Sequence, residues 1–228
     1  MKEQEETTPH ENQSKKRASR KSAATTRKYM DAAEALFVRF GYEGTSIRAI
    51  SSRAKMNLST VVYHWGSKEA LFRAVCLRLF SEIVDEQVRR LKLIGERGET
   101  LSRADLRAVL RALVEPPLLM PEDANTAART RLLYGRVLTD PSPVALKVTT
   151  DIFGTATELF RSAVRRCLSD LDEGTFYWRY VCAVGSFVIA QSFENRFSYA
   201  LGLAEGNPDW SIVAEEIVQS MAAALDHE

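Results

Sequence analysis

Residues 45–65 read TSIRAISSRAKMNLSTVVYHW, and this stretch decides the fold of the N-terminal part of the chain. Apolar residues recur at helical spacing before and after a short break at Lys55-Met56. Thr45 or Ser46, just after Gly44, is placed to cap the first of the two helices. Neither helix is long enough to be stable alone, so the pair must pack on a third helix. The stretch therefore predicts two short helices joined by a tight turn.

The third helix is predicted directly upstream, from about residue 26 to residue 40. Apolar residues at helical spacing mark one face of it from Met30 to Phe40, and Gly41 follows as a stop signal. The apolar residues of the two short helices and their turn are then expected to face inward: Ile47, Ile50, Ala54, Met56, Val61 and Trp65. We expect the three helices to share one small core.

The second short helix is left with small, polar and aromatic residues on its outer side: Leu58, Ser59, Thr60, Tyr63 and His64. A helix of this kind suits insertion into the major groove of DNA, which is ~12 Å wide. A helical hairpin that serves only for packing would show the same periodicity. The pattern alone favours neither interpretation.

Charge is distributed unevenly along the 228 residues. The whole chain has 31 Lys and Arg against 30 Asp and Glu, a net charge of +1. Residues 1–68 hold 13 basic and 7 acidic residues, a balance of +6, and residues 69–228 hold 18 and 23, a balance of −5. The near-neutral net charge is therefore the sum of a basic N-terminal region, which suits a polyanionic partner, and an acidic remainder.

Residues 1–25 are almost devoid of apolar side chains and are predicted to form a disordered basic arm. Its charge is concentrated in one cluster: Lys15, Lys16, Arg17, Arg20 and Lys21. Two roles are open for this arm. It is either a solvated tail or a segment that follows DNA into an adjacent minor groove.

The rest of the chain continues as helices with short breaks. A long helix is predicted from Ser67, followed by helices over residues 103–114, 124–138, 144–169, 173–201 and 209–226. The helix over residues 103–114 is expected to end at Pro116-Pro117. No stretch shows sustained strand alternation with hairpin turn signals. The predicted fold class is all-α, with a three-helix N-terminal domain and a larger C-terminal helical bundle.

Several classes of protein are excluded by what the sequence lacks. Cys76, Cys167 and Cys182 lie far apart, which is typical of inert core thiols in a reducing compartment rather than of disulfides or a zinc site. No nucleotide-binding, hydrolase or metalloprotease motif is present, and the three histidines do not pair. The polar N-terminus is no secretory signal, and the longest apolar stretch, residues 181–190, is too short to span a membrane. We expect a cytoplasmic protein without enzymatic activity, metal or cofactor.

Residues 54–71, AKMNLSTVVYHWGSKEAL, resemble the signature of the tetracycline-repressor-type (TetR) transcriptional regulators. The usual run in that family is Ala-Gly-Val-Ser-x-x-x-Leu-Tyr-Tyr-His-Phe-x-Ser-Lys-Glu-Ala-Leu, without gaps. The resemblance covers about residues 26–80. It implies a helix-turn-helix DNA-binding domain there and an effector-binding and dimerisation domain over residues 81–228.

The resemblance also implies DNA contacts for nine residues: Thr45, Arg48, Asn57, Leu58, Ser59, Thr60, Tyr63, His64 and Lys68. Thr45 would offer its hydroxyl or its backbone N–H, and Lys68 its ammonium, to phosphates at the starts of two helices, and Asn57 would cap the recognition helix. Residues 58–60 would read bases. Two differences from the usual family run affect the predicted DNA contacts. Val62 stands where the family usually has Tyr. Leu58 stands where a polar residue is common, and it would cover a thymine methyl group.

For the C-terminal domain, the resemblance implies a pocket for a small hydrophobic or amphipathic effector. Its candidate lining is Leu113, Leu132, Leu133, Tyr134, Val137, Phe153, Phe160 and Val164, although any of these residues could be plain core. The last two helices would pair with a second copy of the chain through Tyr177, Tyr180, Val181, Val184, Phe187 and Val188. The alternative is that this apolar surface is core within one chain.

The predicted function is a ligand-responsive transcriptional repressor that binds palindromic operator DNA as a homodimer. Two alternatives remain at the level of sequence. One is a helical small-molecule-binding or interaction protein that has lost operator binding. The other is an all-helical enzyme, for which the sequence offers no set of catalytic residues.

Overall fold

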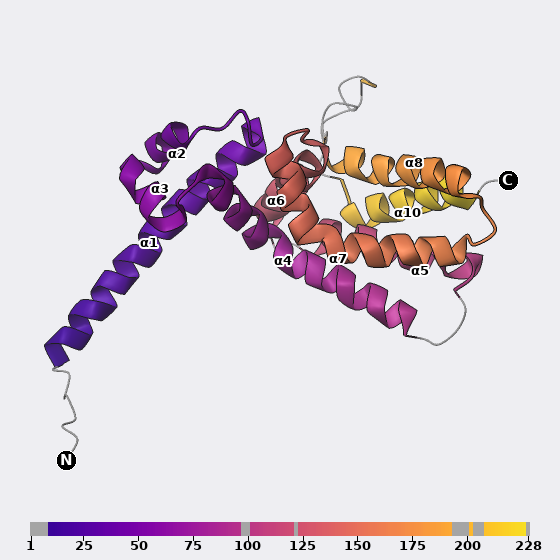
Figure 1. Ribbon diagram of the computed structural model, residues 1–228, viewed down its shortest axis with the longest axis horizontal. Coiled ribbons are helices and arrows are strands. Elements are labelled where there is room, and N and C mark those ends of the chain that lie inside the picture. Colours follow the sequence, from indigo (N-terminus) through magenta and orange to yellow (C-terminus); the bar gives the residue numbers. More distant parts are fainter. Residues whose placement is uncertain (1–8, 97–100, 121–122, 193–200, 203–207, 227–228) are drawn as a thin grey trace, which may run out of the picture. The chain divides into compact units, whose positions relative to one another are not determined.

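The computed structural model describes residues 9–96, 101–120, 123–192, 201–202 and 208–226. These residues form helices and turns without any β-strand, so the predicted all-α fold class is confirmed (Figure 1). The chain divides into two compact units, Met1–Val75 and Cys76–Glu228. The division falls inside one long helix, close to the expected domain boundary at residue 80.

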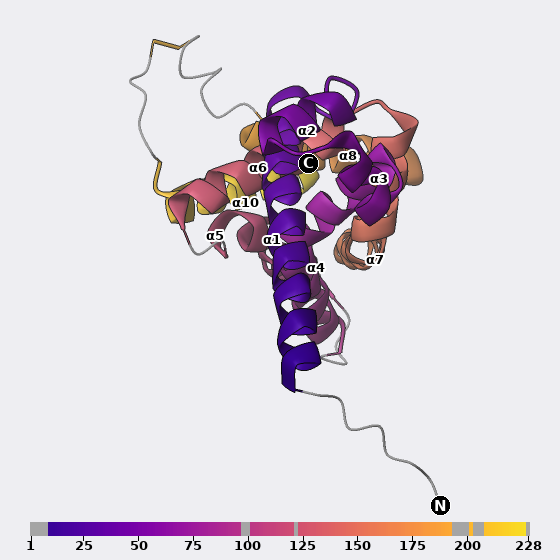
Figure 2. The same ribbon diagram turned by 90° about the vertical axis from the view of Figure 1, so that its left-hand side faces the viewer.

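The first unit contains α1 (Pro9–Phe40), α2 (Ile47–Ala54), α3 (Leu58–Trp65) and the start of α4 (Lys68–Gly95). α2 and α3 lie beside the C-terminal half of α1 (Figures 1 and 2). Phe37 and Phe72 are fully buried and meet edge-to-face, with ring centroids 4.9 Å apart. Tyr42 stacks on Phe37 at 6.4 Å, so aromatic contacts form the centre of this small core.

The expected disorder of residues 1–25 is wrong for residues 9–25, because α1 begins at Pro9. Residues 1–8 lie outside the described part of the chain. Proline is well suited to the first position of a helix, and the residues that follow contain no glycine and no second proline. Alanine, lysine, arginine and glutamine are good helix formers, so the packed part of α1 can continue backward as helix.

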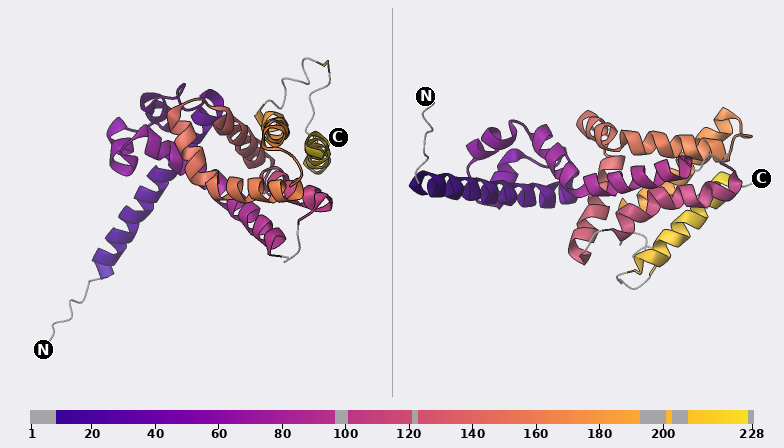
Figure 3. Two further views of the ribbon diagram at one scale, coloured as in Figure 1. Left: turned by 45° about the vertical axis from the view of Figure 1, so that its right-hand side comes forward. Right: turned by 90° about the horizontal axis from the view of Figure 1, so that it is seen from below.

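The second unit contains the rest of α4 and six further described elements: η1 (Arg103–Asp105), α5 (Leu106–Leu119), α6 (Ala124–Thr139), α7 (Pro143–Cys167), α8 (Glu173–Ser192) and α10 (Trp210–Asp226). α8 and α10 lie side by side, and the left-hand view of Figure 3 shows them nearly end-on. The helix predicted over residues 173–201 ends at Ser192 in the described part. Residues 193–200, which the prediction also assigned to this helix, are outside it.

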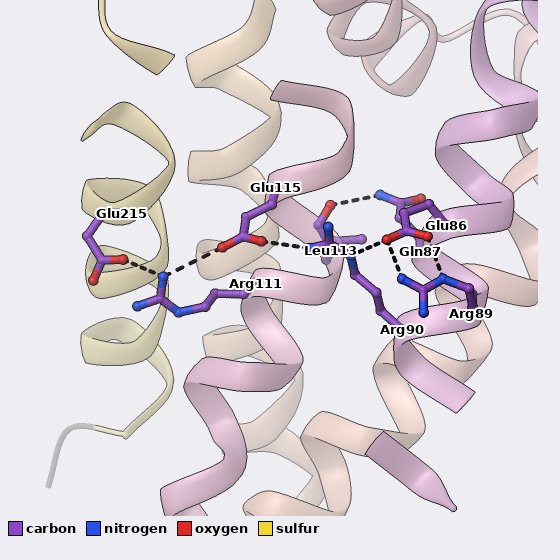
Figure 4. Close-up of polar contacts among 8 residues, drawn as sticks. All are labelled: Glu86, Gln87, Arg89, Arg90, Arg111, Leu113, Glu115 and Glu215. Atoms are coloured by element: carbon purple, nitrogen blue, oxygen red, sulfur yellow. Dashed lines mark hydrogen bonds and ion pairs between the residues drawn. The ribbon is translucent and has the colours of Figure 1, made fainter. Parts of the chain in front are cut away.

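The sequence predicted that helix α5 ends at its two prolines. That prediction is wrong, because α5 continues through Pro116 and Pro117 to Leu119. Proline has no backbone N–H, so the carbonyl oxygen of Leu113 has no donor four residues ahead. The side chain of Gln87 on α4 supplies one, since its Nε2 donates to that oxygen at 2.8 Å (Figure 4). Gln87 is fully buried, so this bond satisfies the Leu113 carbonyl oxygen in the interior although Pro117 offers it no donor.

A series of ion pairs, drawn in Figure 4 with the Gln87–Leu113 hydrogen bond, links α4, α5 and α10. Arg90 lies 2.7 Å from Glu86 and 2.6 Å from Glu115, and Arg111 lies 2.7 Å from Glu215. Hydrogen bonds from Arg89 and Arg90 lower the pKa of Glu86 to about 2. The network therefore stays ionised at neutral pH and ties three helices together at their partly exposed edges.

Two of the three cysteines are core thiols, as predicted. Cys76 and Cys167 are buried, and burial raises the pKa of both thiols. Cys182 is exposed on α8, so its assignment to the core is wrong. The helical periodicity around it was correct, but α8 carries apolar side chains on more sides than its own chain covers. Among the described residues, no helix has the length and hydropathy needed to cross a membrane.

Candidate nucleic-acid interface

Helix α3 is held in place by Tyr29, a fully buried residue of α1. The Tyr29 hydroxyl donates a hydrogen bond to the backbone carbonyl oxygen of Asn57, directly before α3. The Tyr29 ring meets the ring of Trp65, the last residue of α3, edge-to-face at 5.9 Å between centroids. One side chain therefore contacts both ends of the helix, which fixes its orientation on α1.

The outer side of α3 is on the surface, as the periodicity predicted. Leu58 is 44% exposed and Tyr63 is 85% exposed, and Ser59 is exposed between them. Thr60 and His64 are half-buried, and the His64 ring packs edge-to-face against Tyr63 at 5.1 Å. Leu58, Ser59 and Tyr63 therefore lie on the part of the α3 surface that the DNA-binding interpretation requires to be accessible.

The N-terminus of α2 differs from the prediction at Thr45. Thr45 is buried, and its hydroxyl lies 2.8 Å from the carbonyl oxygen of Gly41 and 3.1 Å from that of Leu36. It is therefore occupied within the unit and is not placed to offer that hydroxyl to a phosphate. Ser46 caps the helix instead, accepting a hydrogen bond from the backbone N–H of Ala49 at 3.1 Å.

The structural role of Thr45 predicts the effect of removing its hydroxyl. Thr45→Val keeps the shape but removes the hydroxyl hydrogen that the carbonyl oxygens of Gly41 and Leu36 share, and should lower the free energy of unfolding by ~1–2 kcal/mol. Thr45→Ser keeps the hydroxyl and should cost less. Urea denaturation monitored by circular dichroism measures both changes. If Thr45→Val weakened DNA binding with no loss of stability, the original phosphate role would be correct.

Lys68 begins α4, and Ser67 caps that helix by accepting from the backbone N–H of Ala70 at 3.1 Å. The Lys68 ammonium lies 4.0 Å from the centroid of the Tyr42 ring, a cation–π contact. Burial and the carboxylates of Glu69 and Glu43 raise the pKa of Tyr42, so the ring remains a neutral phenol. The ring positions the charge of Lys68 at the start of α4, where the prediction requires a phosphate contact.

The turn between α2 and α3 is closed by Lys55 in the left-handed conformation, with φ = 54°. Its N–H donates to the carbonyl oxygen of Ser52, and the N–H of Met56 donates to that of Ser51. These two backbone hydrogen bonds form a Schellman motif, in which the residue in the left-handed conformation is usually glycine. A lysine there costs ~1–2 kcal/mol relative to glycine.

The residues predicted to form the dimer interface are only partly exposed on the second unit. Tyr177 and Val181 are exposed on α8, and Tyr180 and Val184 are half-buried. Phe187 and Val188 are buried within the chain itself, so their assignment to the interface is wrong. The periodicity missed the exposed apolar residues of this surface: Trp178 and Ile189 on α8 and Ile212 on α10.

Two family models match the chain. Residues 30–75 match the model of bacterial regulatory proteins of the tetR family. Residues 111–224, which are 114 of the 228 residues, match the tetracyclin repressor-like C-terminal domain. The chain belongs to the TetR family. A comparison with curated protein sequences found no significant match.

Solved structures of other regulators share the TetR fold of this chain. A TetR-like transcriptional regulator from Rhodococcus sp. RHA1 is 18% identical, with a TM-score of 0.52 over 89% of this chain and 94% of that one. The fatty acid degradation regulator FadR from Bacillus halodurans is 14% identical, with a TM-score of 0.56 over 90% and 97%. HlyIIR, a hemolysin II transcriptional regulator, is 16% identical, with a TM-score of 0.50 over 91% and 99%.

The effector lining predicted for this TetR-family chain lies mostly in its packed interior. Seven of the eight residues are buried, and Leu132 is half-buried. Tyr134 and Phe153 meet edge-to-face at 5.1 Å, and both rings pack on Phe80. These residues form an aromatic and aliphatic cluster inside the second unit, and their assignment as effector lining stays a prediction.

A pocket of about 570 Å³ lies beside this core, lined by Arg78, Leu79, Glu82, Ile83, Met120, Asp123, Thr126 and Thr130. Two of these lining residues lie one helical turn before a buried polar pair, since Ile83 precedes Gln87 on α4 and Thr130 precedes Tyr134 on α6. Gln87 Nε2 lies 3.4 Å from the Tyr134 hydroxyl, and burial raises the pKa of Tyr134 to about 12. Gln87 Oε1 is buried without a hydrogen-bond partner.

Proposed function

We propose that this TetR-family regulator is a cytoplasmic repressor that binds palindromic operator DNA as a homodimer and releases it when a small molecule binds the second unit. The observation that carries the DNA-binding part is the surface of α3. Its exposed residues stand on a helix that Tyr29 contacts at both ends, with a positioned cation at Lys68. In this proposal, residues 58–60 read bases, and Ser46, Arg48, Asn57, Tyr63, His64 and Lys68 contact or frame the phosphates.

The effector that the second unit would take is small and amphipathic. The pocket lined by α4 and α6 offers charged and hydroxyl groups, and Gln87, whose buried Oε1 has no partner, follows the lining residue Ile83 by one turn of α4. A ligand with an apolar body and a hydrogen-bond donor at its buried end would satisfy both environments. Binding would release the operator by favouring a conformation that no longer fits the half-site spacing.

The decisive experiment is a gel-shift titration of the full chain against the DNA that flanks its coding region. Specific retardation that weakens with rising salt supports the repressor, because phosphate contacts release counterions. Absence of any specific retardation would instead favour the alternative of a helical ligand-binding protein that has lost operator binding, for which Val62 in place of the usual Tyr is the sequence argument.

Two substitutions should separate phosphate contacts from base contacts. Lys68→Ala is expected to weaken binding to all sequences about equally and to reduce the salt slope by ~2, because the homodimer loses one contact at each half-site. Thr60→Ala is expected to relax base preference at one position of each half-site, by ~1–3 kcal/mol in discrimination. Selection from random DNA, followed by titrations at several salt concentrations, measures both. Equal effects of the two variants would contradict these assigned roles.

Leu58 gives a specific expectation about the operator. Its exposed side chain has no hydrogen-bonding group, so it discriminates by apolar contact with the thymine methyl group. We expect selected DNA to show thymine at one position of each half-site, and Leu58→Ala to lose that preference. Selection of DNA with no thymine preference in either protein would show that the contact does not exist.

A further inference from the structure

The strained lysine in the turn between α2 and α3 marks a surface that none of the assigned DNA contacts includes. Lys55 occupies a left-handed position where the usual family run has glycine, so the turn itself gives no reason for a lysine. The side chain of Lys55 is exposed. What lysine adds at this position over glycine is a positive charge at the surface, two residues before the start of the recognition helix.

Two further cations lie next to Lys55. Lys28 of α1 and Arg53 of α2 line a hollow of about 420 Å³ together with it, and Asp31, Ala32 and Ala54 complete the lining. Lys28, Arg53 and Lys55 are all exposed. Three cations against one carboxylate give this hollow a net positive charge, and three different segments of the chain contribute the cations to one concave surface.

The place of the hollow in the first unit is set by contacts already described. Lys28 directly precedes Tyr29, whose hydroxyl bonds the carbonyl oxygen of Asn57 at the N-terminal end of α3. Lys55 is three residues from Leu58, so their Cα atoms are at most ~11 Å apart. This is close to the ~12 Å width of the major groove, and phosphates border that groove. When the start of α3 enters the groove, Lys55 therefore lies within about one groove width of the bordering phosphates.

We propose that Lys28, Arg53 and Lys55 form a phosphate clamp that grips the DNA backbone beside the N-terminal end of α3. The clamp rests on the proposed operator binding and adds to the contact at Lys68. Its ligands are neighbouring phosphodiester groups of the DNA backbone, which the three cations hold by charge without reading sequence. The strain of the turn is retained because the left-handed lysine completes the clamp.

The test compares the salt dependence of operator binding among four proteins. Lys55→Gly removes the charge and relieves the strained backbone, and Arg53→Gln with Lys55→Gly removes two charges. Lys92→Gln, an exposed cation of the second unit, is the matched control. Each lost phosphate contact should reduce the slope of log Kobs against log salt by ~0.9, and the homodimer loses it at both half-sites, so we expect reductions of ~1.8 and ~3.6 and no change in that order. Lys55→Gly should also unfold at a higher urea concentration than the wild-type protein, which separates weaker binding from misfolding.

The outcomes are distinguishable. Wild-type binding with the same slope in the two clamp variants overturns the clamp and leaves the repressor intact. No specific binding by the wild-type protein overturns both. If inorganic phosphate stabilises the wild-type protein against heat but not Lys55→Gly, while the DNA slope is unchanged, the hollow binds a free anion and the DNA clamp is wrong.

Discussion

A single acidic residue on the exposed apolar face of α8 is expected to separate the dimer and to weaken operator binding by ~10²-fold or more. Val181→Asp is the variant that tests this. Val181 is exposed and lies one turn from Tyr177 and Trp178, and the latter is 65% exposed. A carboxylate at the centre of a paired apolar surface would be buried without a partner, which is strongly unfavourable. The loss of binding follows because each half-site would then be occupied independently, without the effective concentration of a linked pair.

Sedimentation equilibrium and operator titration measure the two consequences separately. The matched control is Leu146→Asp on α7, where an apolar residue that is 66% exposed receives the same charge outside the proposed interface. The control should remain a dimer and bind as the wild-type protein does. If Val181→Asp stayed dimeric at the concentrations used for DNA binding, this face of α8 would not be the dimer interface.

The second large effect is expected at Gln87, in the form of a coupling with Pro117. In the wild-type background, Gln87→Leu leaves the buried carbonyl oxygen of Leu113 without a donor, because Pro117 has no N–H to offer. In a Pro117→Ala background, the N–H of residue 117 can bond that oxygen within the helix. Gln87→Leu should therefore cost ~1–3 kcal/mol more of unfolding free energy when Pro117 is present than when it is absent.

Urea denaturation of the four proteins at one protomer concentration measures this coupling. The buried Gln87 Oε1, which has no partner, is removed by Gln87→Leu in both backgrounds, so its contribution cancels from the difference. A shift of 1–3 kcal/mol corresponds to a change in Tm of ~2–12 °C for a chain of this size. Equal costs of Gln87→Leu in both backgrounds would show that the hydrogen bond across the prolines contributes nothing to stability.

The sequence predicted the elements that depend on local pattern. Helical periodicity and capping residues placed α2 and α3 within one or two residues, and the run from residue 54 to residue 71 was specific enough to indicate the family. The exposure of Leu58 and Tyr63 also followed from the period, since inward positions on a short helix leave few others. These features need only the neighbours within a few turns.

The wrong predictions share a cause, which is that a side chain's partner lies elsewhere in the chain. Thr45 sits at a helix start, where a hydroxyl often meets a phosphate, but the end of α1 brings two carbonyl oxygens to it. Pro116 and Pro117 normally end a helix, but Gln87, some thirty residues earlier, replaces the missing donor. Neither partner is visible in the local sequence.

The sequence by itself determined that this protein is all-helical, that its first unit carries a recognition helix of the TetR type, and that its basic charge is concentrated at the front. Only the tertiary structure decided which side of α8 is covered, that Cys182 is exposed, and that Lys28 joins Arg53 and Lys55 in one hollow. When a helix has apolar residues on several sides, each of these sides fits the helical periodicity equally well as the buried one. The choice between those sides depends on the helices packed against it, which periodicity does not specify.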